Sequence, residues 1–286
     1  MTVHISIKGG LGNQLFQYSF GVYLKEKYNA TIYYDILPLK FIESNLTKRE
    51  YTLSKIDADL KLTSHKIHFL FYTQNNNTLV KIVKKICRKL LNFHFISEES
   101  FNETSLLDNY TYYLDGYWQD TKFATLIVNT INENSNLQME KDIKLEKIKK
   151  SGVSVAIHIR RGDYVTNTVI NNYHGSCDIN YFTKAMRLIE EKINVDTYFV
   201  FSDDIEWAKN NLTSNKPLNF MDKNDALTDL LLMKNCCHQI ISNSTFSFWA
   251  AFLNIYSKKY IIAPKKWTNH IKTKDSNLYN ETWILL

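Results

Sequence analysis

The order of apolar and polar residues along the chain shows two kinds of pattern, short strand-like runs and helical periodicity. Short β-rich apolar runs fall at residues 3–7, 31–34, 153–159, 198–202, 217–220, 238–242 and 260–263. In the second half, helical patterns separate these runs, near residues 181–192, 205–210, 225–235 and 246–256. Strands that alternate with helices at this spacing predict a parallel sheet covered by helices.

The first half is less regular. A glycine-rich turn follows its first strand and leads into an apolar helix from about residue 13 to residue 27, and its second strand ends at Asp35. Further helical patterns lie at 79–91 and 140–150. We therefore predict an α/β protein whose two halves face each other across a cleft. Ligands of parallel sheets bind at the carboxyl ends of the strands, so polar residues there are the candidates for chemistry.

Composition and charge narrow the class of protein. The 286 residues are 44% hydrophobic and 22% charged, as in ordinary globular proteins. The net charge of +6 is diffuse, and no arginine-rich stripe or zinc-finger spacing argues for nucleic acid. The first residues lack the pattern of a signal peptide and run into a predicted strand, and no apolar run of about 18 residues occurs, so we expect neither a secretory signal nor a membrane span. Its four cysteines lack paired metal-ligand spacing. We expect a cytoplasmic protein whose substrates carry phosphates.

The motif His-Ile-Arg-Arg-Gly-Asp-Tyr, residues 158–164, follows the apolar strand 153–157. Arginine forks match phosphate oxygens bidentately, so two guanidinium groups at a strand end indicate a diphosphate. Asp163 could orient one of the arginines or end a turn. An internal Arg–Asp salt bridge beside a core histidine is the alternative interpretation.

A second motif, Gly-Gly-Leu-Gly-Asn-Gln at residues 9–14, joins the first strand to its helix. Glycines let the backbone approach a ligand closely, and a helix N-terminus offers N–H donors to an anion. Asn13 is a reasonable helix cap and a neutral donor for a sugar or phosphate oxygen. The motif is neither a Walker A loop nor the dinucleotide fingerprint. A plain strand–turn–helix connection is the alternative.

Three more polar groups follow predicted strands. Ser-Asn-Ser-Thr-Phe-Ser at 242–247 opens a helix, and a simple helix cap accounts for only one of these residues. Phe-Ser-Asp-Asp ends another strand at 201–204. Asp225 and Asp229 share one face of a helix, where an aspartate can accept from the N1 and N2 donors of guanine. A solvated helix start is the alternative for each aspartate.

Together these motifs resemble the bacterial α-1,2-fucosyltransferases of glycosyltransferase family 11 and, more distantly, protein O-fucosyltransferases and α-1,6-fucosyltransferases. The resemblance covers nearly the whole chain. It implies a GT-B-like fold of two Rossmann-like halves, with an acceptor-side domain at residues 1–150 and a GDP-fucose-binding domain at 151–286. The implied reaction is the inverting, metal-independent transfer of L-fucose to the 2-hydroxyl of a terminal galactoside, in O-antigen or surface glycan synthesis.

The resemblance also implies roles for single residues. Arg160 stabilises the diphosphate of GDP-fucose and Asn13 reaches the fucose or the β-phosphate. His158 and Asp163 support this catalytic site. Asp225 reads guanine. The residues that bind GDP-fucose are Gly10, Gly12, Arg161, Ser202, Asp203, Asp225, Asn243, Ser244 and Thr245.

Several alternatives remain open in the sequence. The catalytic base is Asp35, Asp115 or no residue at all, if deprotonation is late. Asp57 and Asp59 match an Asp-x-Asp metal motif, but no apolar strand precedes them, so no metal cofactor is expected. The rival functions are a fucosyltransferase of other linkage or acceptor and a non-catalytic carbohydrate-binding protein. The natural acceptor and the oligomeric state are not determined by the sequence.

The segment 79–91 predicts a helix with apolar residues on one face and five basic residues mostly on the other. A basic amphipathic helix can lie on an anionic membrane surface. One interpretation is therefore peripheral contact with the inner membrane. The other is a surface helix that packs its apolar face on the core.

Overall fold

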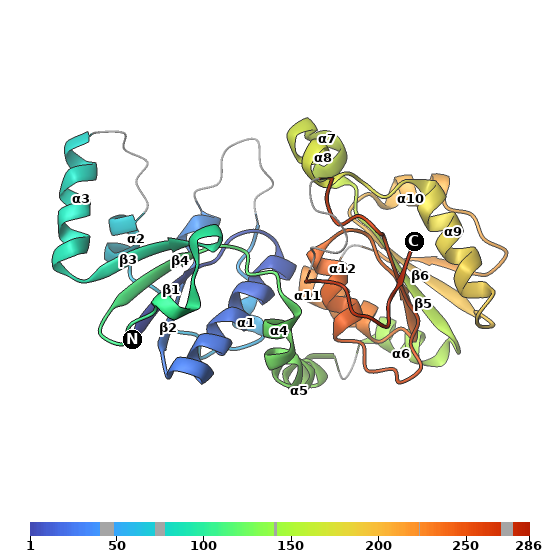
Figure 1. Ribbon diagram of the computed structural model, residues 1–286. Helices are drawn as coiled ribbons and strands as arrows, with labels where there is room; N and C mark the ends of the chain where they lie inside the picture. Colours follow the sequence, from blue (N-terminus) through green and yellow to red (C-terminus); the bar gives the residue numbers. More distant parts are fainter. Residues whose placement is uncertain (41–48, 72–77, 140–141, 223, 270–276) are drawn as a thin grey trace. The chain divides into compact units, whose positions relative to one another are not determined.

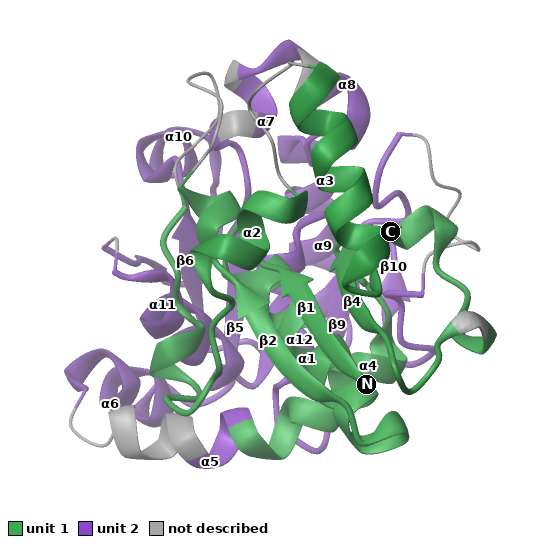
Figure 2. Ribbon diagram, turned by 90° about the vertical axis from the view of Figure 1, so that its left-hand side faces the viewer, with its two compact units in different colours: residues 1–130 green, residues 131–286 purple. Residues whose placement is uncertain are grey.

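The computed structural model describes residues 1–286 except 41–48, 72–77, 140–141, 223 and 270–276 (Figure 1). The chain forms two compact units, Met1–Thr130 and Ile131–Leu286, which we call unit 1 and unit 2 (Figure 2). Each unit contains a parallel β-sheet and helices. The predicted α/β class is confirmed.

The sheet of unit 1 has the strand order β2-β1-β4-β3 within the described residues. Its strands are β1 (Thr2–Ser6), β2 (Thr31–Asp35), β3 (Phe93–Ser97) and β4 (Thr111–Asp115). Its helices are α1 (Leu11–Tyr28), α2 (His65–Phe71), α3 (Thr78–Leu90) and α4 (Thr121–Ala124). Short 3₁₀ helices lie at Leu37–Leu39, Leu53–Lys55, Glu98–Ser100, Glu103–Ser105 and Thr125–Ile127. Helix α5 (Val128–Met139) spans the boundary between the units.

The sheet of unit 2 has the order β10-β9-β8-β5-β6-β7 within the described residues. Its strands are β5 (Ser154–Ile159), β6 (Thr197–Ser202), β7 (Leu218–Phe220), β8 (His238–Ile240), β9 (Ile261–Ala263) and β10 (Ile284–Leu285). Its helices are α6 (Ile143–Lys150), α7 (Gly162–Thr166), α8 (Thr168–His174), α9 (Ile179–Glu190), α10 (Ile205–Asn211), α11 (Ala226–Lys234) and α12 (Thr245–Phe252).

Strand β5 is the centre of unit 2. All six of its residues are buried, which explains why this strand reads as a continuous apolar run in the sequence. Ile157 of β5, Val200 of β6 and Phe182 of α9 belong to one hydrophobic core. After β5 the chain adds β6 and β7 on one side, and then β8, β9 and β10 on the other. The strand order therefore reverses beside β5, and such a reversal is where open α/β sheets bind ligands.

Unit 1 reverses its strand order in the same way. Its chain runs from β1 to the neighbouring β2 and later returns to the other side of β1 with β4. The loops that follow β1 and β4 therefore begin at the same point of the sheet edge. No helix in the described part of the chain is long and apolar enough to cross a membrane.

Candidate active site

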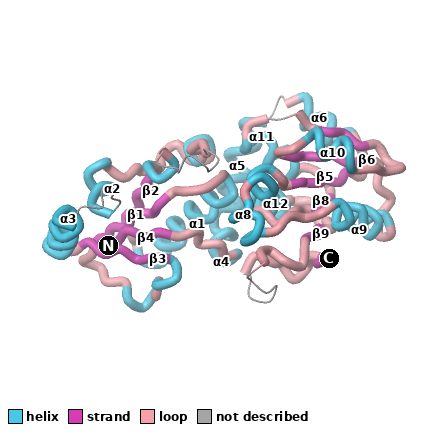
Figure 3. Tube along the Cα trace, turned by 90° about the horizontal axis from the view of Figure 1, so that it is seen from above, coloured by secondary structure: helices cyan, strands magenta, loops and turns pink. Residues whose placement is uncertain are grey.

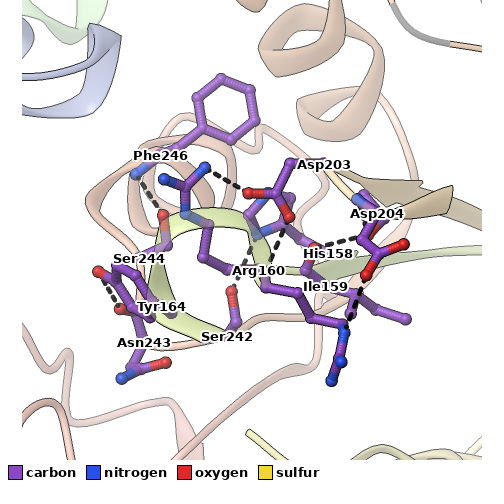
Figure 4. A network of polar contacts seen from close by, with 12 residues as sticks. His158, Ile159, Arg160, Tyr164, Asp203, Asp204, Ser242, Asn243, Ser244 and Phe246 are labelled. Carbon is purple, nitrogen blue, oxygen red and sulfur yellow. Dashed lines mark hydrogen bonds and ion pairs between the residues drawn. The ribbon is translucent and has the colours of Figure 1, made fainter. Parts of the chain in front are cut away.

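Three polar motifs meet at the carboxyl ends of β5, β6 and β8 (Figure 4). The registers of the sheet explain this meeting. Ile159, the last residue of β5, pairs with Ser202, the last residue of β6. Arg160 and Asp203 are the next residues of their strands and so leave the sheet together. Figure 4 shows the carboxylate of Asp203 pointing at the Arg160 guanidinium, with Ser242 and Ser244 on the neighbouring segment.

Each arginine of the motif has its own carboxylate and its own aromatic ring. Nη1 of Arg160 lies 2.6 Å from Oδ2 of Asp203, and its guanidinium lies 5.3 Å from the ring centroid of Tyr164. The second arginine, Arg161, holds Asp204 through Nε at 3.2 Å and lies 3.9 Å from the Trp207 ring. Both arginine side chains remain 17% exposed.

The internal Arg–Asp pair that the sequence left open is therefore present, with Asp203 as the partner of Arg160. The side chain of Asp163 lies outside the described residues. Partial exposure leaves Arg160 within reach of an anion, and the carboxylate fixes the plane of its guanidinium. The pair thus orients the arginine, and this is compatible with phosphate recognition.

The loop after β6 is tightly held. Asp203 Oδ1 also accepts from the backbone N–H of Arg161 at 2.8 Å. Ser202 donates its hydroxyl to the carbonyl of Ile159 at 2.9 Å and accepts from the N–H of Asp204 at 3.0 Å. A β-carbon on Gly162 would lie 2.6 Å from Asp203 Oδ2, so a larger residue at 162 would displace the carboxylate that pairs with Arg160.

His158 is buried at the end of β5. Its Nδ1 lies 3.0 Å from the hydroxyl of Ser242, and its ring packs against Phe246 at a centroid distance of 5.3 Å. Burial lowers the pKa of His158 to about 4, although the charge of Asp203 opposes this shift. The imidazole is thus neutral at pH 7. It connects β5 to the segment after β8 and adds no charge to the site.

Helix α12 begins beside this cluster. Ser244 is its N-cap and accepts from the N–H of Phe246 at 3.3 Å. Ser247 donates its hydroxyl to the carbonyl oxygens of Ser242 and Ser244, both at 3.1 Å. These contacts fix the first turn, which starts at Thr245 and directs backbone N–H groups toward the helix start.

The side chain of Asn243 points into the protein. The residue is 3% exposed, and its Nδ2 donates to the carbonyl oxygens of His174, Gly175 and Trp267 at 2.9, 3.3 and 3.2 Å. Cys177 Sγ lies 3.7 Å from its Oδ1. The amide group predicted to bind GDP-fucose thus connects its own loop to two other backbone segments, at residues 174–175 and at Trp267, and supports the loop from within.

The two aspartates of α11 differ in environment. Asp225 is exposed and caps the helix, because its Oδ1 accepts from the N–H of Leu227 at 3.1 Å. Asp229 is half-buried and accepts from Asn224 Nδ2 at 2.6 Å. Burial raises the pKa of Asp229; hydrogen bonds from Asn224 and the charge of Lys144, which donates to Asn224 Oδ1 at 2.6 Å, offset only part of this shift.

In unit 1, the prediction that Asn13 caps the first helix is wrong. Helix α1 begins at Leu11, so Gly10 is its N-cap and Asn13 lies in the first turn. Side-chain capping is absent at Gly10. Gly9 has a φ of +79°, which favours glycine, and a β-carbon there would lie 2.5 Å from Asn13 Nδ2. Glycine is therefore favoured in the turn before α1, so the N-cap position is a glycine and Asn13 lies inside the helix.

Residues that the sequence interpretation missed hold this glycine turn. Gln119, in the loop after β4, donates to Asn13 Oδ1 at 3.1 Å. Gln14 and Gln17 are fully buried in α1. Gln14 donates to the carbonyl of Gly9 at 3.1 Å, and Gln17 accepts from the N–H of Lys8 at the same distance. The signal in the sequence for Gln14 and Gln17 was the presence of glutamines inside an apolar helix pattern. No sequence signal pointed to Gln119. Gly12 is buried in the first turn.

The two carboxylates considered as catalytic bases differ in access. Asp35 is fully buried and accepts from the Tyr113 hydroxyl at 2.5 Å, His68 Nδ1 at 2.6 Å and the N–H of Leu37 at 3.0 Å. An acceptor hydroxyl cannot reach it in this structure. Asp115 is partly exposed and pairs with Lys8 Nζ at 2.9 Å.

The Asp-x-Asp sequence is part of a local turn. Asp57 Oδ2 accepts from the Tyr18 hydroxyl at 2.9 Å and its Oδ1 from the N–H of Asp59 at 3.0 Å. Across the described residues, no group of three or more His, Cys, Asp or Glu side chains could hold a metal ion.

Comparisons with known proteins give the family. The model of glycosyl transferase family 11 matches residues 2–286. The O-antigen biosynthesis glycosyltransferase WbnK of Escherichia coli is 31% identical over 98% of this chain and 99% of its own length. An α-1,2-colitosyltransferase of E. coli is 30% identical over 97% of this chain and 96% of its own. Human galactoside α-(1,2)-fucosyltransferase 1 is 33% identical over 35% of this chain and 28% of its own.

Among solved structures, the fucosyltransferase NodZ from Bradyrhizobium matches with a TM-score of 0.50, covering 88% of this chain and 91% of its own, at 12% identity. At this identity the likeness concerns the fold alone, and it confirms the predicted GT-B-like fold. The family model covers nearly every residue, including the two motifs that carried the resemblance. The chain is therefore a glycosyltransferase that belongs to glycosyl transferase family 11.

Proposed function

We propose that this enzyme transfers L-fucose from GDP-fucose to the 2-hydroxyl of a terminal galactoside. The observation that carries the proposal is the oriented pair Arg160 and Arg161 at the strand-order reversal of unit 2, beside the N-terminus of α12. Guanidinium groups and helix N-termini both favour a diphosphate. The names of the relatives supply the acceptor and the linkage, and WbnK supplies the biosynthetic setting, O-antigen assembly.

The proposed chemistry follows from charge. Cleavage of the fucosyl–phosphate bond leaves an oxocarbenium-like sugar and adds negative charge to GDP. Arg160, held by Asp203, stabilises that leaving group together with the N-terminus of α12, where Ser244 is the N-cap and Thr245 the first helical residue. These groups take the role that a metal ion has in other transferases, so the reaction is proposed to be metal-independent. The acceptor hydroxyl attacks from the opposite face of the sugar, which inverts the anomeric carbon.

The remaining roles are divided by geometry. His158, Ser202 and Asn243 are positioning residues, because their polar groups bond to other parts of the protein. In unit 1, Asn13 reaches the fucose or the β-phosphate from a turn that Gly10 and Gly12 allow. We propose residues 151–286 as the GDP-fucose-binding domain, with Asp225 at guanine, and residues 1–150 as the acceptor side.

Colitose is the second candidate for the transferred sugar, because the α-1,2-colitosyltransferase matches almost the full chain. The deciding experiment offers the enzyme GDP-fucose and GDP-colitose in parallel, each with a panel of galactosides, and determines the product linkage by NMR. We expect fucosylation at O2 of a terminal galactose. Turnover with GDP-colitose but not with GDP-fucose would show that the transferred sugar is colitose and not fucose. A product linked elsewhere than O2 would overturn the proposed linkage.

A further inference from the structure

Helix α3 presents its apolar residues to solvent. The side chains of this stripe are exposed by half to three quarters: Leu79 72%, Ile82 49%, Val83 57%, Ile86 53% and Leu90 77%. No residue of the helix is buried. The expectation that this helix packs its apolar face on the core is therefore wrong.

The opposite side of α3 faces the rest of unit 1. Helix α3 contacts α2 and β3, and Figures 1 and 3 both show it beside α2. Lys84 lies 6.0 Å from the ring centroid of Phe69, and the Arg88 guanidinium lies 5.8 Å from that of Phe71. Lys84 and Arg88 are partly buried by this packing. Two cationic side chains thus take the inward position that the apolar residues would normally occupy.

A row of lysines borders the exposed stripe. Lys81, Lys85 and Lys89 recur every four residues and are all exposed. At helical spacing they form one line along the helix, next to the line that contains Ile82 and Ile86. The outward surface of α3, which we call the α3 face, thus combines the five apolar residues of the stripe with these three lysines.

The net positive charge of the chain arises in the sequence segment that contains this helix, and is not diffuse as the overall composition suggested. Seven of the 35 Lys and Arg residues lie between residues 60 and 97, a segment with no Asp or Glu. The rest of the chain then has 28 basic residues against 29 acidic ones. The excess of +6 thus arises in this one segment.

We infer that the α3 face docks on an anionic lipid surface. Apolar side chains of an interfacial helix enter the boundary between headgroups and acyl chains, and lysines beside them contact anionic headgroups. A second copy of this chain is a poor occupant, because two α3 faces would bring together two segments without any acidic residue. Nucleic acid would leave the stripe exposed. A lipid surface satisfies both the apolar residues and the charge.

Co-sedimentation with vesicles tests the inference. The probes are phosphatidylcholine vesicles with and without phosphatidylglycerol, each at low and high salt. We expect the wild type to sediment only with phosphatidylglycerol and to be released by salt, because salt screens the attraction. The inference is overturned if the wild type stays in the supernatant at low salt.

Two α3 variants and one matched control sharpen the test. Lys81→Glu with Lys85→Glu should weaken vesicle binding by at least about 25-fold, since each lysine near such a surface contributes about fivefold. Ile82→Asn with Ile86→Asn should also abolish binding. The control, Lys149→Glu with Lys150→Glu on α6, makes the same charge change at exposed lysines of unit 2 and should bind like the wild type.

Thermal unfolding of each variant shows that it is folded, and sedimentation velocity without vesicles reports self-association. Wild-type binding by the control together with weakened binding by the α3 charge variant supports the inference. Equal loss in both variants would overturn it, because net charge rather than the α3 face would then decide, and so would unweakened binding by the α3 charge variant. A wild type that dimerises through Ile82 and Ile86 and ignores vesicles would overturn it as well.

Discussion

Removal of the Arg160 guanidinium is the sharpest test of the site. In Arg160→Ala the protein loses the 2.6 Å pair with Asp203 and the packing on Tyr164. The partner carboxylate keeps the N–H of Arg161 and is itself 27% exposed, so it is not left buried and unpaired. Partly exposed ion pairs contribute about 1 kcal/mol or less, and the unfolding temperature should therefore fall by no more than about 4 °C.

The effect on the rate should be far larger. One charge-stabilising donor at a developing negative charge commonly lowers the barrier by about 3 kcal/mol, which corresponds to a loss of about 150-fold in kcat. Arg160→Lys keeps the charge but loses the planar fork, so it should also fail. Arg187 on α9 is exposed, and Arg187→Ala is the matched loss of one arginine elsewhere in unit 2.

The assay measures kcat and KM for GDP-fucose with a galactoside acceptor, alongside thermal unfolding of each variant. The reasoning predicts low turnover with a nearly unchanged unfolding temperature in Arg160→Ala, and normal values for both in Arg187→Ala. More than about a tenth of wild-type turnover in Arg160→Ala would refute the role, because about 3 kcal/mol implies a much larger drop. Loss of the fold together with activity would instead make Arg160 a structural residue.

Three further predictions follow from the same geometry. Transfer should persist in excess EDTA; a strict requirement for manganese or magnesium, restored by adding the ion back, would refute the metal-independent mechanism and return attention to Asp57 and Asp59. His158 is held neutral with its pKa lowered from 6.5 to about 4, so the unfolded chain takes up its proton first as the pH falls and stability is lost between about pH 6.5 and pH 4. Urea unfolding at pH 7 and pH 5 should show about 2 kcal/mol of this loss in the wild type and not in His158→Asn; an equal loss in both would reject the assignment. Asn243→Ala should lower the free energy of unfolding by about 3 kcal/mol, because it leaves three carbonyl oxygens, of His174, Gly175 and Trp267, without their donor. Reduced activity with unchanged urea unfolding in Asn243→Ala would show instead that the amide acts on the substrate.

Strands β5 to β9 of the second half could be predicted because each is an apolar run beside helical patterns, whereas the two-residue strand β10 and the short helices α7 and α8 were missed. The predicted strands at 153–159 and 198–202 end within one residue of β5 and β6. In the first half, β3 and β4 were missed. They consist of Phe-His-Phe-Ile-Ser and Thr-Tyr-Tyr-Leu-Asp, where histidine and tyrosine obscure the apolar run. Tyr113 is nonetheless fully buried, since its hydroxyl donates to Asp35.

The motifs of the site could be found in the sequence, but their partners could not. Asp163 lies in the same motif as the arginines and was a candidate to orient one of them, but its side chain lies outside the described residues; the structure pairs Arg160 with Asp203, which the sequence did not single out as its partner. The reason is the register of two parallel strands, which sets Ile159 opposite Ser202. The register depends on how whole strands pack against each other, so it cannot be read from a short local motif of a single sequence.

The charge arrangement of the site explains how two arginines can be accommodated at the end of a buried strand in the absence of substrate. Asp203 and Asp204 offset the two guanidinium charges and hold them in place, and neutral His158 connects the strand to the serines before α12 without adding a third charge. In the proposed reaction the diphosphate would meet donors that are already oriented, so little reorganisation would be needed when negative charge grows on the leaving group. Because the carboxylates lie on the loop after β6 and the arginines on the loop after β5, this preorganisation depends on the register of those two strands.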